Sequence, residues 1–331
     1  MRRSSIILPI ALLTAAVGCG ADDAGLDAYR RAVPTSAALS VDVPAGTKEA
    51  TPGQAAQALT AQRAGLYNLT YTISRQANGW IGAGLQIVEA IVDYPPTSFE
   101  AGRAVWGPFT PALEPLSWTL EVTKTGEETY AYVLSARDKD QANDPMQAIL
   151  SGTSVKGAGA PSVVGGYRGQ YTLNFSALHA LDAELYSETG TMLARYDLTG
   201  NERRLEMTLQ DFVDDGDPAQ DAEYGYVERA DGSGEFRIAG LTDLEEDDSA
   251  QEHVVVRSTW NAQGAGRADA EFSGGNLSAS VTATECWDPS FARSFYQDTI
   301  QGQLPGGELA SCAFATAIDP DFELDLDLQS N

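Results

Sequence analysis

Four aspartates lie close together between two segments of alternating hydrophobicity. Asp214, Asp215 and Asp217 surround a glycine, and Asp221 follows shortly after them. Calcium prefers several carboxylate and carbonyl oxygens on a turn that glycine makes possible, so this cluster is a candidate calcium site. The spacing lacks the regular every-second-residue ladder of a helical calcium loop. A solvated hairpin loop is the alternative explanation, and it needs no metal.

Catalytic chemistry finds little support in the sequence. The chain has two histidines, His179 and His253, and neither lies in a known metal-binding motif. There is no Gly-x-Ser-x-Gly elbow, no phosphate-binding glycine loop and no dinucleotide fingerprint. Paired carboxylates carry no information about glycosidase chemistry, because 47 acidic residues supply many such pairs. We therefore expect a protein that is not an enzyme and that has no cofactor other than the calcium ion considered above.

The charge balance argues against one class of partner. The chain has 47 acidic and 21 basic residues and a net charge of −26 at pH 7. Such a surface repels nucleic acid and anionic lipid head groups, so nucleic acid is not an expected partner. The same charge attracts cations, although solubility alone is a sufficient explanation for it.

The start of the chain has the layout of a secretory signal. A short positive segment precedes an apolar run over residues 6–17, which is too short to span a bilayer as a permanent helix. The residues Ala16-Val17-Gly18-Cys19 resemble the lipobox of bacterial lipoproteins. In that family the cysteine is acylated and becomes the first residue of the mature chain, so the resemblance implies a lipid anchor on Cys19. An ordinary cleaved signal with an incidental cysteine is the alternative.

Export to an oxidising compartment also affects the expected oxidation state of the other two cysteines. With Cys19 assigned to the lipid, Cys286 and Cys312 remain, and in an oxidising compartment they most economically form one disulfide. A thiol nucleophile is the alternative, but no histidine is near either cysteine in sequence. Gly20, not aspartate, follows Cys19, and by resemblance to some Gram-negative lipoproteins this implies the outer membrane. The expected location is the cell envelope, with the membrane as partner of the anchor.

The composition divides the rest of the chain into a tether and one domain. Residues 1–18 form the signal peptide, and residues 19–51, rich in Ala, Asp, Gly and Pro, form a flexible tether. Within the tether, residues 39–43 alternate like a short strand that docks on the body. Residues 52–331 form a single β-rich domain, which begins with a helical layer over residues 52–95.

Two amphipathic segments predict this helical layer. A capping box over residues 51–54 begins the first helix, and Asn78-Gly79 is a natural stop before the second segment over residues 81–92. The apolar residues on one face of the first helix are Leu59, Leu66, Leu69 and Ile73. We expect both helices to cover the core of the domain.

Beyond residue 103 the hydrophobic period changes from about 3.6 to about 2. The alternation over residues 103–285 predicts one antiparallel meander of about eleven strands with a single apolar face. So long a meander is expected to curl into an open or closed barrel, because curling hides the edges of the sheet. Residues 286–331 then form a C-terminal segment that the disulfide ties to the last strand.

An up-and-down meander places successive connections at alternate ends of the sheet, so the sequence predicts two unlike rims. Most connections at one end are short, at residues 125–127, 199–201, 231–234 and 262–266; the exception is the crossing over residues 152–166. Most connections at the other end are long and acidic, at residues 137–145, 179–190, 214–222 and 244–252. The second rim is therefore a candidate surface for a cation or for an envelope protein.

Aromatic residues are spread along the apolar face of the predicted sheet. They are Trp118, Tyr130, Tyr132, Phe175, Tyr224, Phe236 and Trp260. Helices on a curled meander are loosely similar in topology to the periplasmic carriers of lipid and lipoprotein, which hold apolar cargo between barrel and lid. This resemblance implies an apolar ligand within the sheet. A solid core filled by the same side chains is the alternative.

Two further functions stay open. The first is a surface interaction or structural protein that works through the acidic rim, with or without calcium. The second is a hydrolase that uses rim carboxylates, which would need two carboxyl groups at catalytic separation in a concave site.

Overall fold

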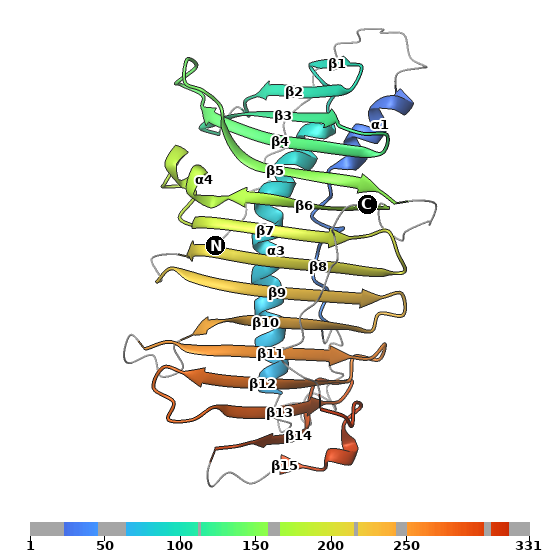
Figure 1. Ribbon diagram of the computed structural model, residues 1–331, viewed down its shortest axis with the longest axis vertical. Coiled ribbons are helices and arrows are strands. Elements are labelled where there is room, and N and C mark those ends of the chain that lie inside the picture. The colour runs from blue at the N-terminus through green and yellow to red at the C-terminus, as the bar shows by residue number, and fades with distance from the viewer. Residues whose placement is uncertain are drawn as a thin grey trace, which may run out of the picture.

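The computed structural model describes residues 23–45, 64–111, 114–157, 166–214, 218–242, 250–300 and 306–317. In these residues, fifteen strands form one sheet in which every strand pairs antiparallel with its sequence neighbours. Figure 1 shows the strands in this order from one edge of the sheet to the other. The predicted antiparallel meander is therefore confirmed.

The strands have the following bounds. At one edge lie β1 (Ser98–Glu100) and β2 (Arg103–Phe109). The central strands are β3 (Leu116–Lys124), β4 (Thr129–Asp138), β5 (Gln147–Lys156), β6 (Tyr167–Asn174), β7 (Thr189–Asp197), β8 (Glu202–Val213), β9 (Gln220–Arg229), β10 (Gly234–Thr242), β11 (Glu252–Trp260), β12 (Gly266–Gly274) and β13 (Val281–Trp287). At the other edge lie β14 (Arg293–Asp298) and β15 (Gly306–Gly307).

The predicted number of strands is wrong, and the error lies at the edges. The eleven predicted segments correspond to β3–β13, whereas β1, β2, β14 and β15 lie outside them. An edge strand has a neighbour on one side only, so its alternation is weaker; all three residues of β1 are exposed. The period of the sequence is therefore clearest in the middle of the sheet.

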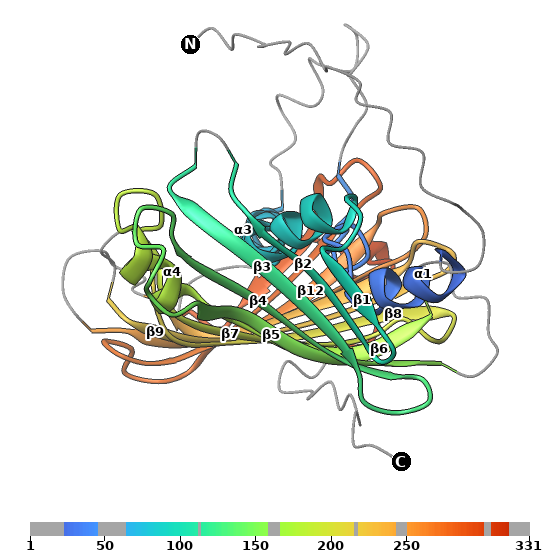
Figure 2. The same ribbon diagram turned by 90° about the horizontal axis from the view of Figure 1, so that it is seen from above.

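The predicted barrel is also wrong. β1 pairs with β2 and β15 pairs with β14, so the two edges do not meet. Helices cover the concave face of the gently curved sheet (Figure 2), and this cover buries the apolar face without closure. The edges themselves are only three and two residues long, and short edge strands limit pairing with other chains.

The antiparallel order places the connections on alternate ends of the sheet, as the sequence predicts. The turns β3–β4, β7–β8, β9–β10 and β11–β12 share one end, which we call the short-loop end. The connections β4–β5, β6–β7, β8–β9 and β10–β11 share the other, which we call the long-loop end. Residues 215–217 and 243–249 of the predicted acidic rim lie outside the described residues.

A single long helix, α3 (Gly65–Val92), crosses the strands on the concave face (Figures 1 and 2). The predicted break at Asn78-Gly79 is wrong, because Asn78 has a tertiary role instead. Its side-chain amide accepts a hydrogen bond from the nitrogen of Val41 (2.6 Å) and donates one to the Val41 oxygen (3.0 Å). Residues 52–63 of the predicted helical layer lie outside the described part. Among the described helices, none is both long enough and apolar enough to cross a membrane.

Residues 23–45, expected to belong to a flexible tether, pack on the body. The helix α1 (Asp23–Ala32) places Tyr29 edge-on against Tyr130 of β4, with ring centroids 5.4 Å apart. Leu39, Val41 and Val43 are buried, so the expected docking of residues 39–43 is confirmed, although they form no strand. The apolar residues of this segment therefore complete the cover of the sheet.

A short helix, α4 (Phe175–Leu181), replaces the predicted strand end at Phe175. Its N-cap is Asn174, whose side-chain oxygen accepts a hydrogen bond from the nitrogen of Ala177 (2.9 Å). This is the interaction expected of an asparagine N-cap, and it ends β6. Phe175 and Leu178 point into the core from this helix and are buried.

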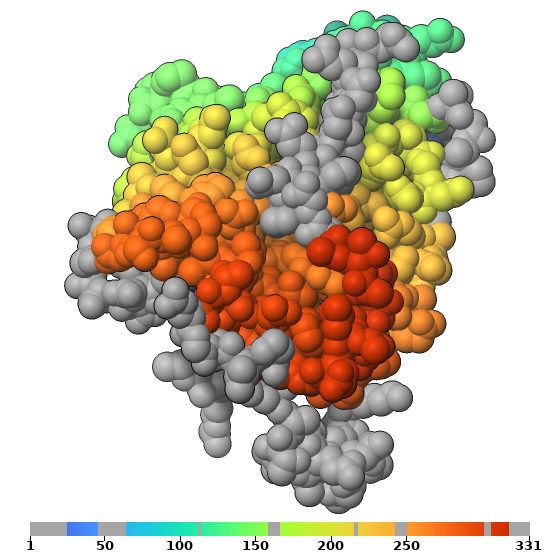
Figure 3. Space-filling view, turned by 60° about the horizontal axis from the view of Figure 1, so that its bottom comes forward, coloured from blue at the N-terminus to red at the C-terminus, as the bar shows by residue number. Residues whose placement is uncertain are grey.

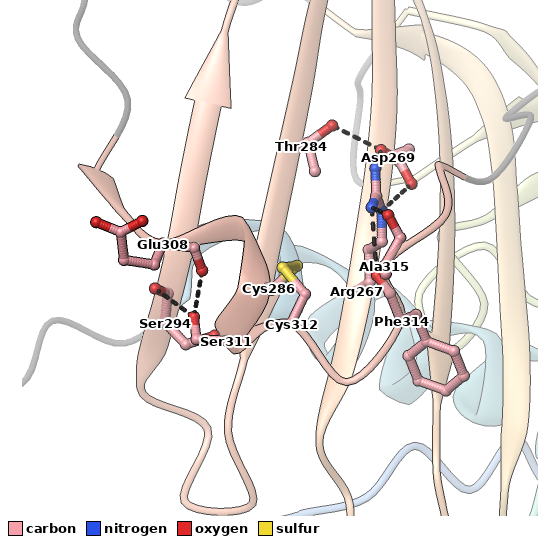
Figure 4. The surroundings of a disulfide bond; sticks show 10 residues. All are labelled: Arg267, Asp269, Thr284, Cys286, Ser294, Glu308, Ser311, Cys312, Phe314 and Ala315. Atoms are coloured by element: carbon pink, nitrogen blue, oxygen red, sulfur yellow. Dashed lines mark hydrogen bonds and ion pairs between the residues drawn. A yellow bond between two sulfur atoms is a disulfide. The ribbon is translucent and has the colours of Figure 1, made fainter.

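The C-terminal residues 306–317 lie on the outer, convex face of the last strands, where Figure 3 shows them in deep red. The predicted disulfide is present and joins Cys286 of β13 to Cys312 (Figure 4). Beside it, Arg267 of β12 forms a buried bidentate ion pair with Asp269 (2.7 and 2.8 Å). Arg267 also donates to the main-chain oxygens of Phe314 and Ala315 (3.3 and 3.2 Å). A covalent bond and charged hydrogen bonds thus both hold this segment to the sheet.

Candidate functional site

The seven aromatic residues predicted to face a ligand are all buried on the concave side of the molecule. The exposed fraction of Tyr224 is 9%, and the other six side chains are 3% exposed or less. Most of them therefore fill a solid core, which was the alternative interpretation. Tyr224 differs, because it borders a hollow between α3 and the sheet.

This hollow, which we call the α3 groove, has a volume of about 320 Å³ and lies over β8–β12, toward the long-loop end. From α3 it is lined by Leu69, Ile73, Gln76 and Trp80. The strands contribute chiefly the apolar side chains of Leu209, Phe212, Tyr224, Ile238, Val254 and Phe272. It is a concave, mainly apolar site at the lower end of the size range of small-molecule pockets.

The orientation of α3 explains why large apolar side chains line the groove. The face of α3 that meets the sheet in its first half carries the small residues Thr70, Ser74 and Ala77, which are all buried. Small residues let the helix approach the strands closely, and the Thr70 hydroxyl lies 2.7 Å from the Ser258 hydroxyl of β11. Leu69 and Ile73, expected from the sequence to lie in the core, consequently lie at the side of the helix and are only half-buried.

An aromatic cluster forms one wall of the groove. The Trp80 ring meets Phe212 edge-on, with centroids 5.1 Å apart, and lies 5.9 Å from the Tyr224 ring. Phe175 of α4 supports Phe212 in the same edge-on way at 5.2 Å. Burial raises the pKa of the Tyr224 hydroxyl to about 12, so this side chain stays neutral at physiological pH. Edge-to-face contacts of this kind hold the rings in defined orientations.

The polar groups of the groove are few and include no cation. Gln76 and Gln220 contribute amides, and Asp214 contributes a carboxylate. Within the described residues, the lining contains no lysine, arginine or histidine. The electrostatics therefore favour a ligand whose polar end is uncharged or positive.

The structure describes two of the four aspartates of the predicted calcium site. Asp214 and Asp221 are described, and the Asp221 carboxylate accepts a hydrogen bond from the nitrogen of Asp211 (2.9 Å). Asp215 and Asp217 lie outside the described residues. Across the described ranges, no three acidic, histidine or cysteine side chains are placed to hold one metal ion. Calcium binding therefore stays a prediction from the sequence.

The structure describes two of the three cysteines. Cys286 and Cys312 form the predicted disulfide. Cys19, the predicted site of lipid attachment, lies outside the described residues. The sequence pattern does not mark Trp80 and Phe212 as groove residues. Trp80 follows Ile73 by seven residues and so shares its helical face, but the predicted stop at Asn78-Gly79 leaves it outside both predicted helical segments.

Comparison of the chain with known protein families, with curated proteins and with solved structures found no match.

Proposed function

We propose that the protein is an exported, lipid-anchored protein of the cell envelope that binds an apolar small molecule in the α3 groove and catalyses no reaction. The observation that carries this proposal is the stripe formed by Leu69, Ile73 and Trp80 on α3. These side chains are only half-buried and face an apolar strand surface across a space of about 320 Å³. Filling this space would remove apolar surface from water, at about 25 cal/mol for each Å² buried.

The charges of the groove define the ligand further. Asp214 would repel a carboxylate or phosphate, whereas the amides of Gln76 and Gln220 can accept and donate hydrogen bonds. The proposed ligand is therefore an apolar compound with a neutral or cationic polar end. Its size is bounded by the groove, which suits one or two rings or a short acyl chain better than a whole phospholipid.

An uncharged fluorophore, N-phenyl-1-naphthylamine, tests the binding. We expect its emission to rise on saturable binding to the wild-type protein. Ile73→Asp should weaken this binding by about tenfold or more, because a buried charge would oppose the apolar probe. The matched control is Ile87→Asp, which changes another half-buried isoleucine of α3 that does not line the groove. Equal affinities for both variants, or no saturable binding, would contradict the proposal.

Trp80 supplies a second measurement at the same site. Trp80 lines the groove, whereas Trp106, Trp118, Trp260 and Trp287 do not. Energy transfer falls steeply with the distance between donor and probe, so Trp80 should be the most efficient donor to a probe in the groove. Trp80→Phe keeps an aromatic wall and removes the donor, so the probe should still bind while the transfer falls.

The location rests on the lipobox resemblance, and the disulfide supports it because such bonds persist in oxidising compartments. Multiple acyl chains on Cys19 would hold the protein firmly at a membrane. We expect mass spectrometry of the mature protein to find an acylated Cys19 at its amino terminus. Cys19→Ser should release the protein into the soluble fraction. An unmodified mature terminus would contradict the anchor and leave the binding proposal untouched.

The acidic rim supports a second candidate function, because the long connections do share one end of the sheet. In this alternative, the protein uses that rim for contact with an envelope protein, with calcium bound near Asp214 and Asp221. A thermal melt with and without calcium distinguishes the metal-dependent form: ligand binding to the folded state raises the midpoint. An unchanged midpoint would exclude it.

A further inference from the structure

A second hollow lies near the short-loop end of β6 and β7, away from the α3 groove. It has a volume of about 450 Å³ and is enclosed by α1, the segment after it, the last residues of α3 and the two strands. Its walls include Val33, Val92 and Leu198, and Arg30 and Arg31 of α1 border it. We call it the α1 pocket.

The charges around the α1 pocket differ from those of the groove. Arg30 is already engaged, since it lies 3.6 Å from Asp27 and donates to the main-chain oxygen of Tyr94 (3.4 Å). Arg31 donates to the main-chain oxygen of Asp27 (3.3 Å), and no carboxylate in the described ranges pairs with it. Asp93 borders the same pocket and is the acidic group on its wall. Arg31 is therefore the charge that a ligand could neutralise.

Two tyrosines, Tyr167 of β6 and Tyr196 of β7, form the inner wall of the pocket. The Tyr196 hydroxyl is buried and lies next to Gly169 of β6. A Cβ atom at Gly169 would lie 2.2 Å from the main-chain oxygen of Thr153 and 2.8 Å from the Tyr196 hydroxyl, so both the neighbouring strand and this ring require glycine there. Burial raises the pKa of Tyr196, which keeps it a neutral donor.

The charge of Arg31 also affects a tyrosine of this wall, Tyr167. Burial raises the pKa of the Tyr167 hydroxyl, and the positive charge of Arg31 acts on it in the opposite direction. Tyr167 also borders the pocket. The cation and the tyrosine wall are therefore close enough to act on one bound molecule, which a surface arginine remote from the pocket could not do.

We propose that the α1 pocket is a second binding site, which takes a small organic anion whose apolar body lies against Val33, Val92 and Leu198 and whose carboxylate pairs with Arg31. A guanidinium group matches a carboxylate in both charge and geometry. The net charge of −26 repels anions from most of the surface, so we expect an anion to bind where the charge of Arg31 and an apolar wall act together. The pocket and the α3 groove thus accept ligands of opposite polar character.

Isothermal titration with octanoate and with octanamide tests this site, because the two probes have the same apolar chain and similar size, whereas only octanoate is charged. We expect octanoate to bind at least about tenfold more tightly at low salt, and we expect the difference to shrink as salt screens the ion pair. Equal binding of acid and amide, or no binding of octanoate, would overturn the proposal.

Variants of Arg31, Arg75 and Asp93, which are all exposed, locate the bound probe without threatening the fold. Arg31→Gln should weaken octanoate binding about tenfold, whereas Arg75→Gln, on the exposed side of α3, should leave it unchanged. Asp93→Asn should strengthen binding, because it removes a like charge from the wall. Ile73→Asp in the α3 groove should have no effect. Loss of octanoate binding in Ile73→Asp instead would place the acid in the groove and refute this second site.

Discussion

Glu285 of β13 accepts a hydrogen bond from the main-chain nitrogen of Gly65, the first residue of α3, at 2.8 Å. The same carboxylate accepts from the nitrogen of Leu66 (2.5 Å) and from Nε of Arg293 (2.7 Å). Its side chain is completely buried. No side chain of α3 itself caps this end, so a residue far away in sequence neutralises the positive end of the helix dipole. This contact fixes where α3 begins on the sheet.

We therefore expect Glu285→Gln to lower the free energy of unfolding by about 1–3 kcal/mol, because it removes the charge from a buried, hydrogen-bonded site and leaves Arg293 without its partner. Urea denaturation measures the change. Glu271→Gln, on β12, is the control, since Glu271 is only half-buried. A loss of stability in the control equal to that in Glu285→Gln would mean that net charge, not capping, is responsible.

Two glycines of α3 give opposite predictions. A Cβ atom at Gly84 would lie 2.9 Å from Leu150 and 3.0 Å from Leu173, whereas nothing lies within 4 Å of one at Gly79. Gly79→Ala should therefore stabilise the protein by up to about 1 kcal/mol, as alanine favours a helix. Gly84→Ala should destabilise it by about 1–3 kcal/mol through overpacking. Thermal melts of the two variants should shift in opposite directions, and a shared direction would contradict the close packing of α3.

The buried tyrosines predict a fall in stability at high pH. Burial raises the pKa of Tyr224 to about 12 and raises those of Tyr132, Tyr171 and Tyr226 as well. An unfolded tyrosine ionises near pH 10, so the unfolded state loses its protons first. Stability from these residues is complete below about pH 10 and is lost as the pH rises toward 12 and beyond.

Circular dichroism together with absorbance at 295 nm follows this alkaline transition. Tyr224→Phe should lessen the loss of stability between about pH 10 and pH 12, because it removes one group that must ionise. The exposed Tyr94 provides the control, and Tyr94→Phe should leave the transition unchanged. Absorbance near pH 10 that is present in the folded wild type and absent in Tyr224→Phe would show that the Tyr224 ring is accessible and would contradict the prediction.

The disulfide predicts how the C-terminal segment is held. Cys312→Ser should lower the free energy of unfolding by about 2–4 kcal/mol on the chain-entropy account. It should also make residues 306–317 more accessible to limited proteolysis, because only hydrogen bonds, among them those from Arg267 and those between β14 and β15, then hold the described part of the segment. Adding Arg267→Gln should increase cleavage further. If Cys312→Ser is cleaved no faster than the wild type, the hydrogen bonds alone are sufficient to hold the segment.

Part of the fold follows from sequence patterns. The alternation from Leu116 to Val281 predicts the central strands, and glycine-rich turns give their antiparallel order, because both signals are local. Counting the connections also predicts which loops share an end of the sheet. The pattern does not predict the edge strands or the helix at Phe175. An edge strand lacks a second neighbour, so its alternation is weaker. At Phe175, the Asn174 cap ends β6 and begins a helix.

The candidate site could not be predicted in the same way. The size of Leu69 and Ile73 suggests a core position, yet the small residues Thr70 and Ser74 face the sheet. Helix periodicity identifies faces but not which face lies nearest the strands. That choice depends on how closely the two backbones approach, which the contact between Thr70 and Ser258 shows directly.

By itself, the sequence determined the β-rich class, the strand order and the pairing of Cys286 with Cys312. These features depend on local period, turn residues and the small number of cysteines. Only the tertiary structure decided that the sheet stays open and that α3 is one helix. It also decided that Glu285 caps this helix. The α3 groove and the α1 pocket, which differ in the charged groups that border them, likewise follow from the tertiary structure and lie toward opposite ends of the sheet. Each of these features depends on contacts between residues that are distant in sequence. No local sequence pattern reveals the free energy of such contacts.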